Sequence, residues 1–439
     1  MMAGAGKRSW KSWVGLAALY TGTLAIIVGG AAVGTGVMAS SADYPHPHQT
    51  IVEGMTAWDG EWFARVASAG YTYEDGRTPS LGFFPAYPIL GRVIMGLTGM
   101  SANVALLIAS NALMLGTLIV FKGYLSSRVE RRDVGVFALA CVALFPTTFF
   151  FRMAYSDGML LFLMVLSMYG MRERWPVVVI ALVIGLATAT RAVGIALVAP
   201  FVLYLLQIGA MRNRADDAFG GGREEQARRR RIAIGDGALD GNELVIPPDR
   251  IVSRILLVAV ACWGLAAYMG YQYYTYGDPL AFTKAEAAWH DRLPPGDAVE
   301  YAADLLTMEP VRAVYARDCP CYWDLRGPHH TAGLNLQFAN PIYFCGMAIL
   351  VGVGGYKGWL SRPEWVLSAV LLGIPYVSNA YRMCMTSHAR FAAVVFPAYI
   401  VMGQLLARLP RIFAIGVLAC FAILLGTYTA MFSSWYYFL

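Results

Sequence analysis

Long apolar runs are the feature that most constrains how this sequence can fold. A helix needs about 20 mainly apolar residues to cross the hydrocarbon core of a bilayer, and runs on that scale recur from one end of the chain to the other. Hydrophobic residues make up 58% of the sequence and charged residues only 14%, which excludes an ordinary soluble domain. The runs predict an all-α polytopic membrane protein with about eleven transmembrane helices. They lie near residues 14–38, 102–124, 134–151, 157–171, 176–190, 193–209, 255–274, 336–355, 365–379, 391–407 and 412–432.

Basic residues gather on alternate connecting segments. If the N-terminus is cytoplasmic, most of the 34 Lys and Arg residues fall on the cytoplasmic side, in keeping with the positive-inside rule. The basic start, with Lys7, Arg8 and Lys11, precedes a long apolar run and is predicted to be a membrane anchor rather than a cleaved signal peptide. Because the basic residues are spread over many loops, the sequence favours membrane lipids over nucleic acid as a partner.

We predict one transmembrane domain over residues 1–439 with three large connecting segments. The first outer loop spans residues 39–101, the basic cytoplasmic loop spans 210–254, and the second large outer loop spans 275–335. Short amphipathic helices are expected in the outer loops, for example at residues 86–99. Short turns on the same outer face are expected at residues 152–157, 191–193 and 380–390.

The cysteines outside the apolar runs lie in two of these outer segments. Cys319 and Cys321 form a Cys-Pro-Cys sequence in the second outer loop, and Cys384 lies in the last turn. The Cys-Pro-Cys spacing is too tight for an easy disulfide between its own two cysteines. The sequence leaves two alternatives, a disulfide from one of them to Cys384 or three reduced thiols.

The sequence Trp58-Asp59-Gly60-Glu61-Trp62 in the first outer loop places two acids between aromatic residues at the membrane surface. On a helix, Asp59 and Glu61 diverge, so that only one of them can face a given pocket. Asp59 has two interpretations: a cap at the start of a helix, or a general base that takes a proton from a sugar hydroxyl. Trp58, Trp62 and the following Tyr71 either stack on a ligand or form an interfacial aromatic belt.

Four arginines fall at the outer ends of apolar runs: Arg152, Arg191, Arg382 and Arg390. An arginine at membrane depth needs a partner for its charge, and phosphate is a natural one because the guanidinium group binds it through two hydrogen bonds. The alternative for each arginine is a side chain that extends to the interface. Four on one face favour an anionic ligand there.

Further candidate binding residues flank these arginines. The segment Tyr155-Ser156-Asp157 begins an apolar run and is predicted to hold one of the arginines. In the second outer loop, Phe282, Glu286 and Trp289 share one face of a predicted surface helix, which also carries Lys284, a phosphate ligand or a solvated side chain. His329, His330 and His388 do not follow the spacing of a known metal motif, so no protein metal site is predicted.

These motifs together resemble the PIG-V-type mannosyltransferases, which belong to the GT-C superfamily of membrane glycosyltransferases. The resemblance is carried in order by Trp58-Asp59-Gly60, Gly70-Tyr71, Phe83-Phe84-Pro85-Ala86-Tyr87-Pro88, Tyr155-Ser156-Asp157, Thr190-Arg191-Ala192-Val193-Gly194, Gly277-Asp278-Pro279-Leu280-Ala281-Phe282 and Arg390-Phe391 with Phe396-Pro397.

The resemblance implies a GT-C-like helical bundle and an inverting transferase that takes a sugar, commonly mannose, from a polyprenyl-phosphate donor. It implies Asp59 as the catalytic base, arginines that bind the donor phosphate, and a lipid or glycan acceptor in the cell envelope. Some members of the superfamily use a divalent cation, so Asp59 as a metal ligand stays an alternative.

The expected location is a bacterial inner membrane with the site facing the periplasm. Eukaryotic members add the second mannose of the glycosylphosphatidylinositol anchor, but residues 291–335 do not resemble theirs, so that acceptor is not carried over. A lipid or small-molecule transporter is the alternative from another functional class.

Overall fold

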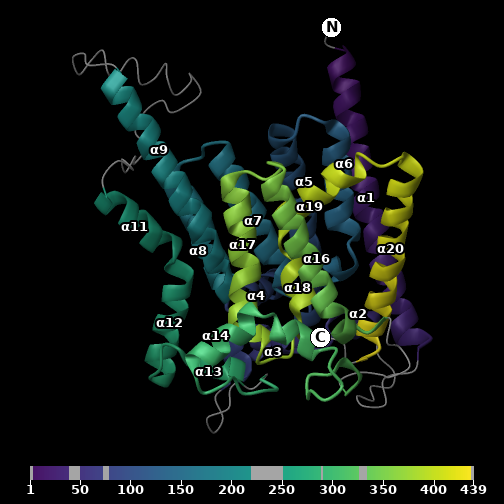
Figure 1. The fold of residues 1–439 in the computed structure, drawn as a ribbon. Helices are drawn as coiled ribbons and strands as arrows, with labels where there is room; N and C mark the ends of the chain where they lie inside the picture. The colour runs from purple at the N-terminus through teal and green to yellow at the C-terminus, as the bar shows by residue number, and fades with distance from the viewer. Residues whose placement is uncertain are drawn as a thin grey trace.

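The computed structural model describes residues 3–38, 50–72, 79–218, 251–287, 290–325 and 334–436, and within them it contains helices, turns and loops but no strands (Figure 1). In the first half of the chain the helices are α1 (Ala3–Gly36), α2 (Ile51–Met55), α3 (Asp59–Ala69), η1 (Pro79–Gly82), α4 (Ala86–Thr98), α5 (Ala102–Arg128), α6 (Arg132–Leu144), η2 (Pro146–Phe151), α7 (Asp157–Arg172), α8 (Val177–Thr190), η3 (Ala192–Leu197) and α9 (Val198–Ala218). In the second half they are α11 (Ile251–Ala261), α12 (Trp263–Tyr276), α13 (Ala281–Glu286), α14 (Ala298–Leu306), α15 (Glu309–Ala313), η5 (Trp323–Leu325), α16 (Leu336–Tyr356), α17 (Arg362–Pro375), η7 (Tyr376–Ala380), α18 (His388–Ala393), α19 (Phe396–Leu406) and α20 (Arg411–Ser433).

The predicted helical class is confirmed, but the predicted count of about eleven spans is not. Among the described residues, four helices are long and apolar enough to cross a membrane by themselves, within α1, α5, α16 and α20. The bent pair α11 and α12, with 60° between the two helices, makes a fifth candidate.

Two of the other predicted runs are interrupted by proline or by a change of helix type. The run at 134–151 divides at Pro146, where α6 gives way to the 3₁₀-helix η2. The run at 365–379 passes from α17 into the π-helix η7 after Pro375. Such breaks leave backbone groups without partners inside the helix, and they are common at functional sites.

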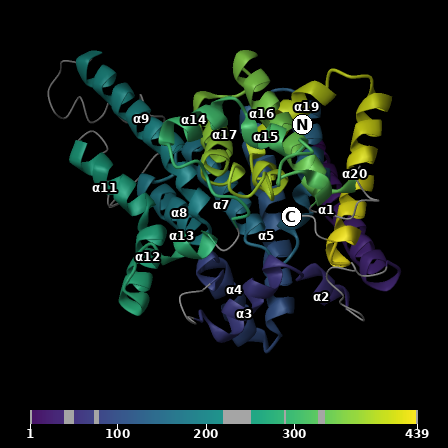
Figure 2. The same ribbon diagram turned by 60° about the horizontal axis from the view of Figure 1, so that its bottom comes forward.

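The helices form a bundle whose two ends differ. α1 packs against α20, α5 against α7, and α6 against α19. The N-terminus and the end of α9 lie at one end of the bundle, which is the top of Figure 1. The short helices α2, α3, α13 and α14 collect at the opposite end, which Figure 2 brings forward. We call this opposite end the loop face; it contains the described parts of both predicted outer loops.

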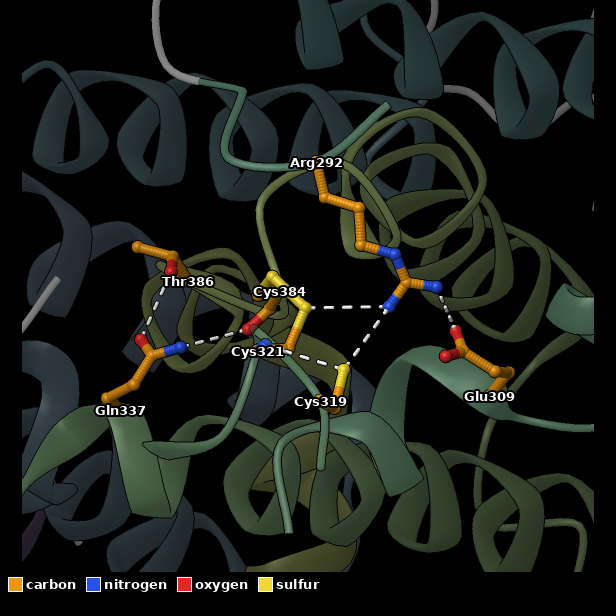
Figure 3. The surroundings of a disulfide bond; sticks show 7 residues. All are labelled: Arg292, Glu309, Cys319, Cys321, Gln337, Cys384 and Thr386. Atoms are coloured by element: carbon orange, nitrogen blue, oxygen red, sulfur yellow. Dashed lines mark hydrogen bonds and ion pairs between the residues drawn. A yellow bond between two sulfur atoms is a disulfide. The ribbon is translucent and has the colours of Figure 1, made fainter. Parts of the chain in front are cut away.

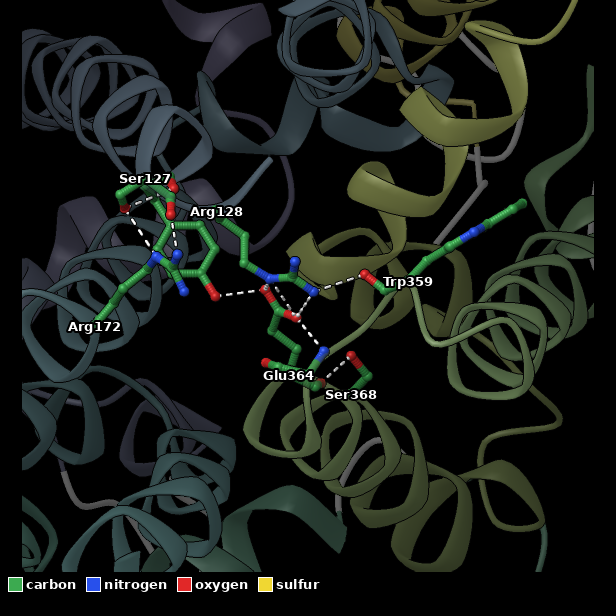
Figure 4. A network of polar contacts seen from close by, with 8 residues as sticks. Ser127, Arg128, Arg172, Trp359, Glu364 and Ser368 are labelled. Carbon is green, nitrogen blue, oxygen red and sulfur yellow. Dashed lines mark hydrogen bonds and ion pairs between the residues drawn. The ribbon is translucent and has the colours of Figure 1, made fainter. Parts of the chain in front are cut away.

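A buried charged network holds the bundle at the end remote from the loop face (Figure 4). Glu364, the third residue of α17, forms a capping box with Ser361 and is fully buried. Arg128, at the end of α5, donates to both carboxylate oxygens of Glu364 at 3.0 Å and to the carbonyl of Trp359 at 2.8 Å. Tyr124 donates a further hydrogen bond to Glu364 at 2.6 Å. Because every lone pair is paired, a buried carboxylate is tolerated here.

Candidate active site

Asp59 and Arg390 form an ion pair on the loop face although 331 positions separate them. A guanidinium nitrogen of Arg390, in α18, donates to Asp59 Oδ2 at 2.7 Å. The Arg390 side chain is 7% exposed and the Asp59 side chain 23% exposed. The pair is therefore shielded from bulk water, while the carboxylate still reaches solvent or a ligand. Asp59 is the first residue of α3, and Trp58 occupies the N-cap position, so the carboxylate does not cap the helix as the first interpretation proposed.

Asp157 and Arg191 form a second pair of the same geometry. Arg191 donates to Asp157 Oδ2 at 2.7 Å, which places the predicted arginine partner on the Tyr155-Ser156-Asp157 segment. Asp157 is the first residue of α7 and its side chain is 1% exposed, whereas that of Arg191 is 21% exposed. Arg191 itself has extended backbone angles between α8 and η3. Gly194 permits this reversal, since a Cβ there would lie 2.2 Å from the carbonyl oxygen of Ala187.

The arginines of the two ion pairs contact a common aromatic ring. The guanidinium carbons of Arg191 and Arg390 lie 5.7 Å and 5.4 Å from the centroid of the same Phe391 ring. Arg390 also lies 5.3 Å from the ring of Tyr155 and 5.5 Å from that of Phe150. The Asp59 N–H donates to the Tyr155 hydroxyl oxygen at 3.1 Å. Two arginines and two carboxylates thus share one low-polarity setting, where charge interactions are stronger than in water.

One hydrogen-bond donor of this cluster has no acceptor among the described residues. The Nε atom of Arg390 is buried without a hydrogen-bond partner among the described residues. A buried, unpaired donor on a charged group costs free energy unless a ligand satisfies it. The same holds for the Nε atom of Arg382. Both atoms are suited to an anionic oxygen.

The second outer loop contributes an acid that the sequence analysis did not single out as a site residue. Glu286, at the end of α13, accepts from Asn379 Nδ2 at 3.5 Å and interacts electrostatically with Arg191 and Arg382. Burial raises the pKa of Glu286 above its usual value, and the Asn379 hydrogen bond and the two arginines partly oppose this shift. The sequence did carry one sign of Glu286, namely its position on the same predicted helix face as Phe282. Burial and the charge of Arg382 lower the pKa of the neighbouring His290.

The chain directly before Arg390 is strained and tightly held (Figure 3). Cys384, Met385 and Ser387 have positive φ angles of 49°, 60° and 64°, which side chains other than glycine rarely adopt. The Gln337 amide on α16 donates to the Cys384 carbonyl at 2.9 Å. A disulfide joins Cys321 to Cys384, so of the two alternatives for the cysteines, the structure forms the bond to Cys384.

Other predicted site residues lie outside the paired cluster. Arg152 is buried, with hydrogen bonds to Thr23 at 2.8 Å, to the Tyr20 carbonyl at 3.1 Å and to Asn111 at 3.2 Å. It therefore fastens α1 to α5, and the expectation that it binds phosphate stays a prediction. Lys284 pairs with Asp278 at 2.5 Å on the surface, away from the two ion pairs.

The aromatic residues of the first outer loop mainly pack against protein. Trp58 has a φ angle of 61°, and its indole N–H donates to the Phe432 carbonyl at 3.3 Å beside Trp435. Trp62 stacks on Phe83 with 6.0 Å between ring centroids. Glu61, next to buried Gly60 in α3, is exposed. Trp289, His329 and His330 lie outside the described residues.

The structure contains an apolar pocket of about 550 Å³. It lies between α3, α4, α8 and α12, and its lining includes Gly70, Tyr71, Ala189 and Tyr268. Ala189 of this lining is two residues before Arg191 in the chain. The Tyr71 hydroxyl donates to the Phe83 carbonyl at 2.7 Å, which turns the ring into the pocket wall.

A metal ion finds no ready ligand set in this part of the chain. The described residues contain no group of three or more His, Cys, Asp or Glu side chains placed to hold one. Asp59 and Asp157 are each engaged by an arginine.

Comparison with known proteins matches the first half of the chain to a family. Residues 35–211 match the family Mannosyltransferase (PIG-V). A curated relative, GPI alpha-1,6-mannosyltransferase 2 of Cricetulus griseus, is 28% identical over 169 residues. That match covers 36% of this chain and 33% of the relative, so it spans about a third of the relative's length.

Solved structures give a more distant likeness. The apo crystal structure of the Archaeoglobus fulgidus oligosaccharyltransferase superposes with a TM-score of 0.41 at 13% identity, over 95% of this chain and 56% of that one. The same enzyme in complex with an inhibitory peptide and a dolichol-phosphate gives a TM-score of 0.40. These similarities are too low to define the fold or the activity of this chain. The resemblance that the ordered motifs indicated is confirmed over residues 35–211, where this integral membrane protein matches the PIG-V mannosyltransferase family.

Proposed function

We propose that this protein is an inverting glycosyltransferase that moves a mannosyl group from a polyprenyl-phosphate donor to a lipid or glycan acceptor of the cell envelope. The observation that carries the proposal is the paired cluster of Asp59 with Arg390 and Asp157 with Arg191 on the loop face. It combines a partly accessible carboxylate with two cations, one of which keeps a buried donor unpaired. Phosphate-linked sugar transfer needs a base and a cationic site for the leaving group.

Asp59 acts as the general base. The acceptor hydroxyl oxygen attacks the anomeric carbon of the sugar, its proton passes to Asp59, and the bond from that carbon to the phosphate oxygen breaks. The bonding pair leaves with the polyprenyl phosphate. Attack from the face opposite the phosphate inverts the anomeric configuration.

The arginines stabilise the charge that develops on the phosphate. Arg191 has the more exposed guanidinium group of the two, at 21%, and serves as the first contact of the donor. Arg390 holds the Asp59 carboxylate in place before the reaction through the 2.7 Å contact. When Asp59 takes the proton, its hold on Arg390 weakens, and the cation becomes available to the leaving phosphate. The proton transfer and the charge compensation are thereby coupled through one side chain.

The apolar pocket receives the polyprenyl chain. Its residues are mainly aliphatic and aromatic, and Ala189 in its lining precedes Arg191 by two residues. An isoprenoid chain buried there gains about 25 cal/mol for each Å² of apolar surface removed from water. The donor phosphate then lies at the Arg191 end of the pocket.

The orientation follows from charge and from the shape of the fold. The loop face carries the site, and the N-terminus and the end of α9 lie at the opposite end of the bundle (Figure 1). Because the basic segments of the sequence belong to that opposite end, we place it in the cytoplasm. The site then faces the periplasm of a bacterial inner membrane.

Transfer of radiolabelled mannose from polyprenyl-phosphate-mannose to a crude envelope extract tests the proposal. Purified wild-type protein should form product, and the Asp59→Asn and Arg191→Ala variants should form little or none while eluting as the same monodisperse species. A transporter would move lipid across vesicles without forming a glycosidic bond. Lack of product from wild type with both mannose and glucose donors, together with lack of donor binding, contradicts the proposal.

A further inference from the structure

Three cysteines and one arginine meet beside the chain that leads to Arg390 (Figure 3). Cys321 and Cys384 are joined by a disulfide, and Cys319 is a free thiol two residues away. The same Arg292 nitrogen lies 3.5 Å from Cys321 Sγ and 3.9 Å from Cys319 Sγ. The Cys321 N–H also donates to Cys319 Sγ at 3.4 Å. The free thiol is thus held next to the disulfide.

Arg292 is itself fixed in place. Its other terminal nitrogen donates to Glu309 at 2.8 Å, and its guanidinium carbon lies 3.4 Å from the ring centroid of Tyr381. The Arg292 N–H donates to the Arg382 carbonyl at 3.1 Å. A fixed cation that contacts both sulfur atoms can compensate negative charge that passes from one to the other.

We propose that Cys319, Cys321, Cys384 and Arg292 form a thiol–disulfide exchange site. The Cys319 thiolate attacks Cys384 Sγ, a Cys319–Cys384 bond forms, the Cys321–Cys384 bond breaks, and the electron pair stays on the Cys321 sulfur. The proton that Cys319 gave up is available to Cys321. One disulfide and one thiol exist before and after the step, so neither an oxidant nor a reductant is needed.

Arg292 serves both ends of this reaction. It lies within reach of the attacking sulfur, Cys319, and of the leaving sulfur, Cys321. The negative charge therefore moves between two atoms that the same cation contacts. Attack of Cys319 on Cys321 is the less favourable route, because it closes the tight Cys-Pro-Cys ring.

The exchange changes which cysteine of the second outer loop is bonded to Cys384, which lies in the turn at residues 380–390. Cys384 begins the strained segment that ends at Ser387, three residues before Arg390. Moving the tether by two positions along the second outer loop shifts the anchor of this segment. The exchange site thereby sets the position of the segment that leads into α18, independently of which reaction Arg390 serves.

Peptide mapping of the full-length protein tests the exchange. Trypsin cleaves after Arg317 and Arg382, so Cys319 and Cys321 share one peptide and Cys384 lies on another. Trapping with N-ethylmaleimide and fragmentation then show which cysteine of the first peptide is alkylated. Wild type moved from pH 6 to pH 8 should yield both linked isomers, and Arg292→Gln should slow their interconversion about tenfold, because the variant lacks the charged contact with the attacking and leaving sulfur atoms.

Two single variants keep the proposal falsifiable. Cys319→Ser should give only the Cys321–Cys384 bond, and Cys321→Ser treated with oxidised glutathione should form the Cys319–Cys384 bond. Hydrogen exchange of the peptide after Arg382 should differ between these two variants. If Cys384 stays fully alkylatable in Cys321→Ser, or wild type holds a single isomer for hours at pH 8, the exchange is refuted. Equal hydrogen exchange in the two variants overturns the effect on the segment.

Discussion

Replacement of Asp59 by asparagine is the sharpest perturbation of the proposed chemistry. The amide keeps the size of the carboxylate and can still accept the hydrogen bond from Arg390, but it cannot take a proton at neutral pH. A general base contributes about 10²–10⁴-fold to the rate, which corresponds to about 3–5 kcal/mol of activation free energy. We expect kcat for mannose transfer to fall by that factor.

The same variant should change stability much less than activity. A hydrogen bond between charged groups contributes about 1.5–3 kcal/mol, and the 23% exposure of the Asp59 side chain reduces this value through solvent screening. Asp157 also acts electrostatically on Arg390 and remains as a negative charge nearby. We therefore expect a loss of about 1–2 kcal/mol in the free energy of unfolding.

Asp157→Asn is the matched control, because Asp157 also begins a helix and also accepts from an arginine at 2.7 Å. Its side chain is only 1% exposed, so it cannot meet the acceptor hydroxyl. Single-turnover transfer from labelled donor should show a fall in the chemical rate for Asp59→Asn and a rise in donor KM for Asp157→Asn. A rate for Asp59→Asn within threefold of wild type would refute the general-base role.

Three further predictions concern stability, pH and the pocket. Arg128→Ala leaves the carboxylate of Glu364 buried without its cation, and should cost about 3–5 kcal/mol of unfolding free energy in detergent. Because the pKa of Glu286 is raised in the folded protein, its ionised form opposes folding, and wild-type stability should fall as pH rises from the usual value of 4.5 through the raised one. Glu286→Gln should remove that fall, so its melting temperature should equal or exceed that of wild type at pH 7.5, with the difference vanishing below pH 4.5. Ala267→Trp, on the pocket wall, should raise KM for a long polyprenyl donor and leave a short-chain donor unaffected, whereas Ala266→Trp on the neighbouring face should change neither.

Each of these has an outcome that contradicts it. Arg131→Ala removes an exposed pair with Asp133 and should cost far less than Arg128→Ala, so an equal loss in both arginine variants would show that burial of the network is not what matters. A lower melting temperature for Glu286→Gln at pH 7.5 would mean that its attraction to the arginines outweighs its burial. Equal KM changes with short and long donors would place the lipid chain elsewhere.

The sequence predicted the class of fold and part of the site. Apolar runs identify helices that suit a membrane, and the family resemblance directed attention to Asp59, Arg191 and Arg390, which the structure brings into one cluster. The number of spans was not predictable in this way. Hydropathy measures the length of an apolar run, but it does not register that Pro146 or Pro375 ends a helix inside one.

The remaining differences between the sequence predictions and the structure come from contacts between residues far apart in the chain. Asp59 and Arg390 are 331 positions apart, and no local pattern specifies that they meet. For the same reason Arg152 looked like the other arginines in sequence, yet α1 supplies its partners Tyr20 and Thr23. Glu286 was visible only as one residue on an amphipathic face, because its burial depends on packing of the second outer loop.

The choice of donor tests the central claim most directly. Purified wild-type protein would be given equal amounts of mannose linked to polyprenyl phosphate and mannose linked to a soluble nucleotide diphosphate, each with its own isotope, together with envelope acceptors. The account predicts product labelled only from the lipid donor, with an anomeric configuration opposite to that of the donor and no label above background in Asp59→Asn. Label from the nucleotide donor, or product that keeps the donor's configuration, would contradict it.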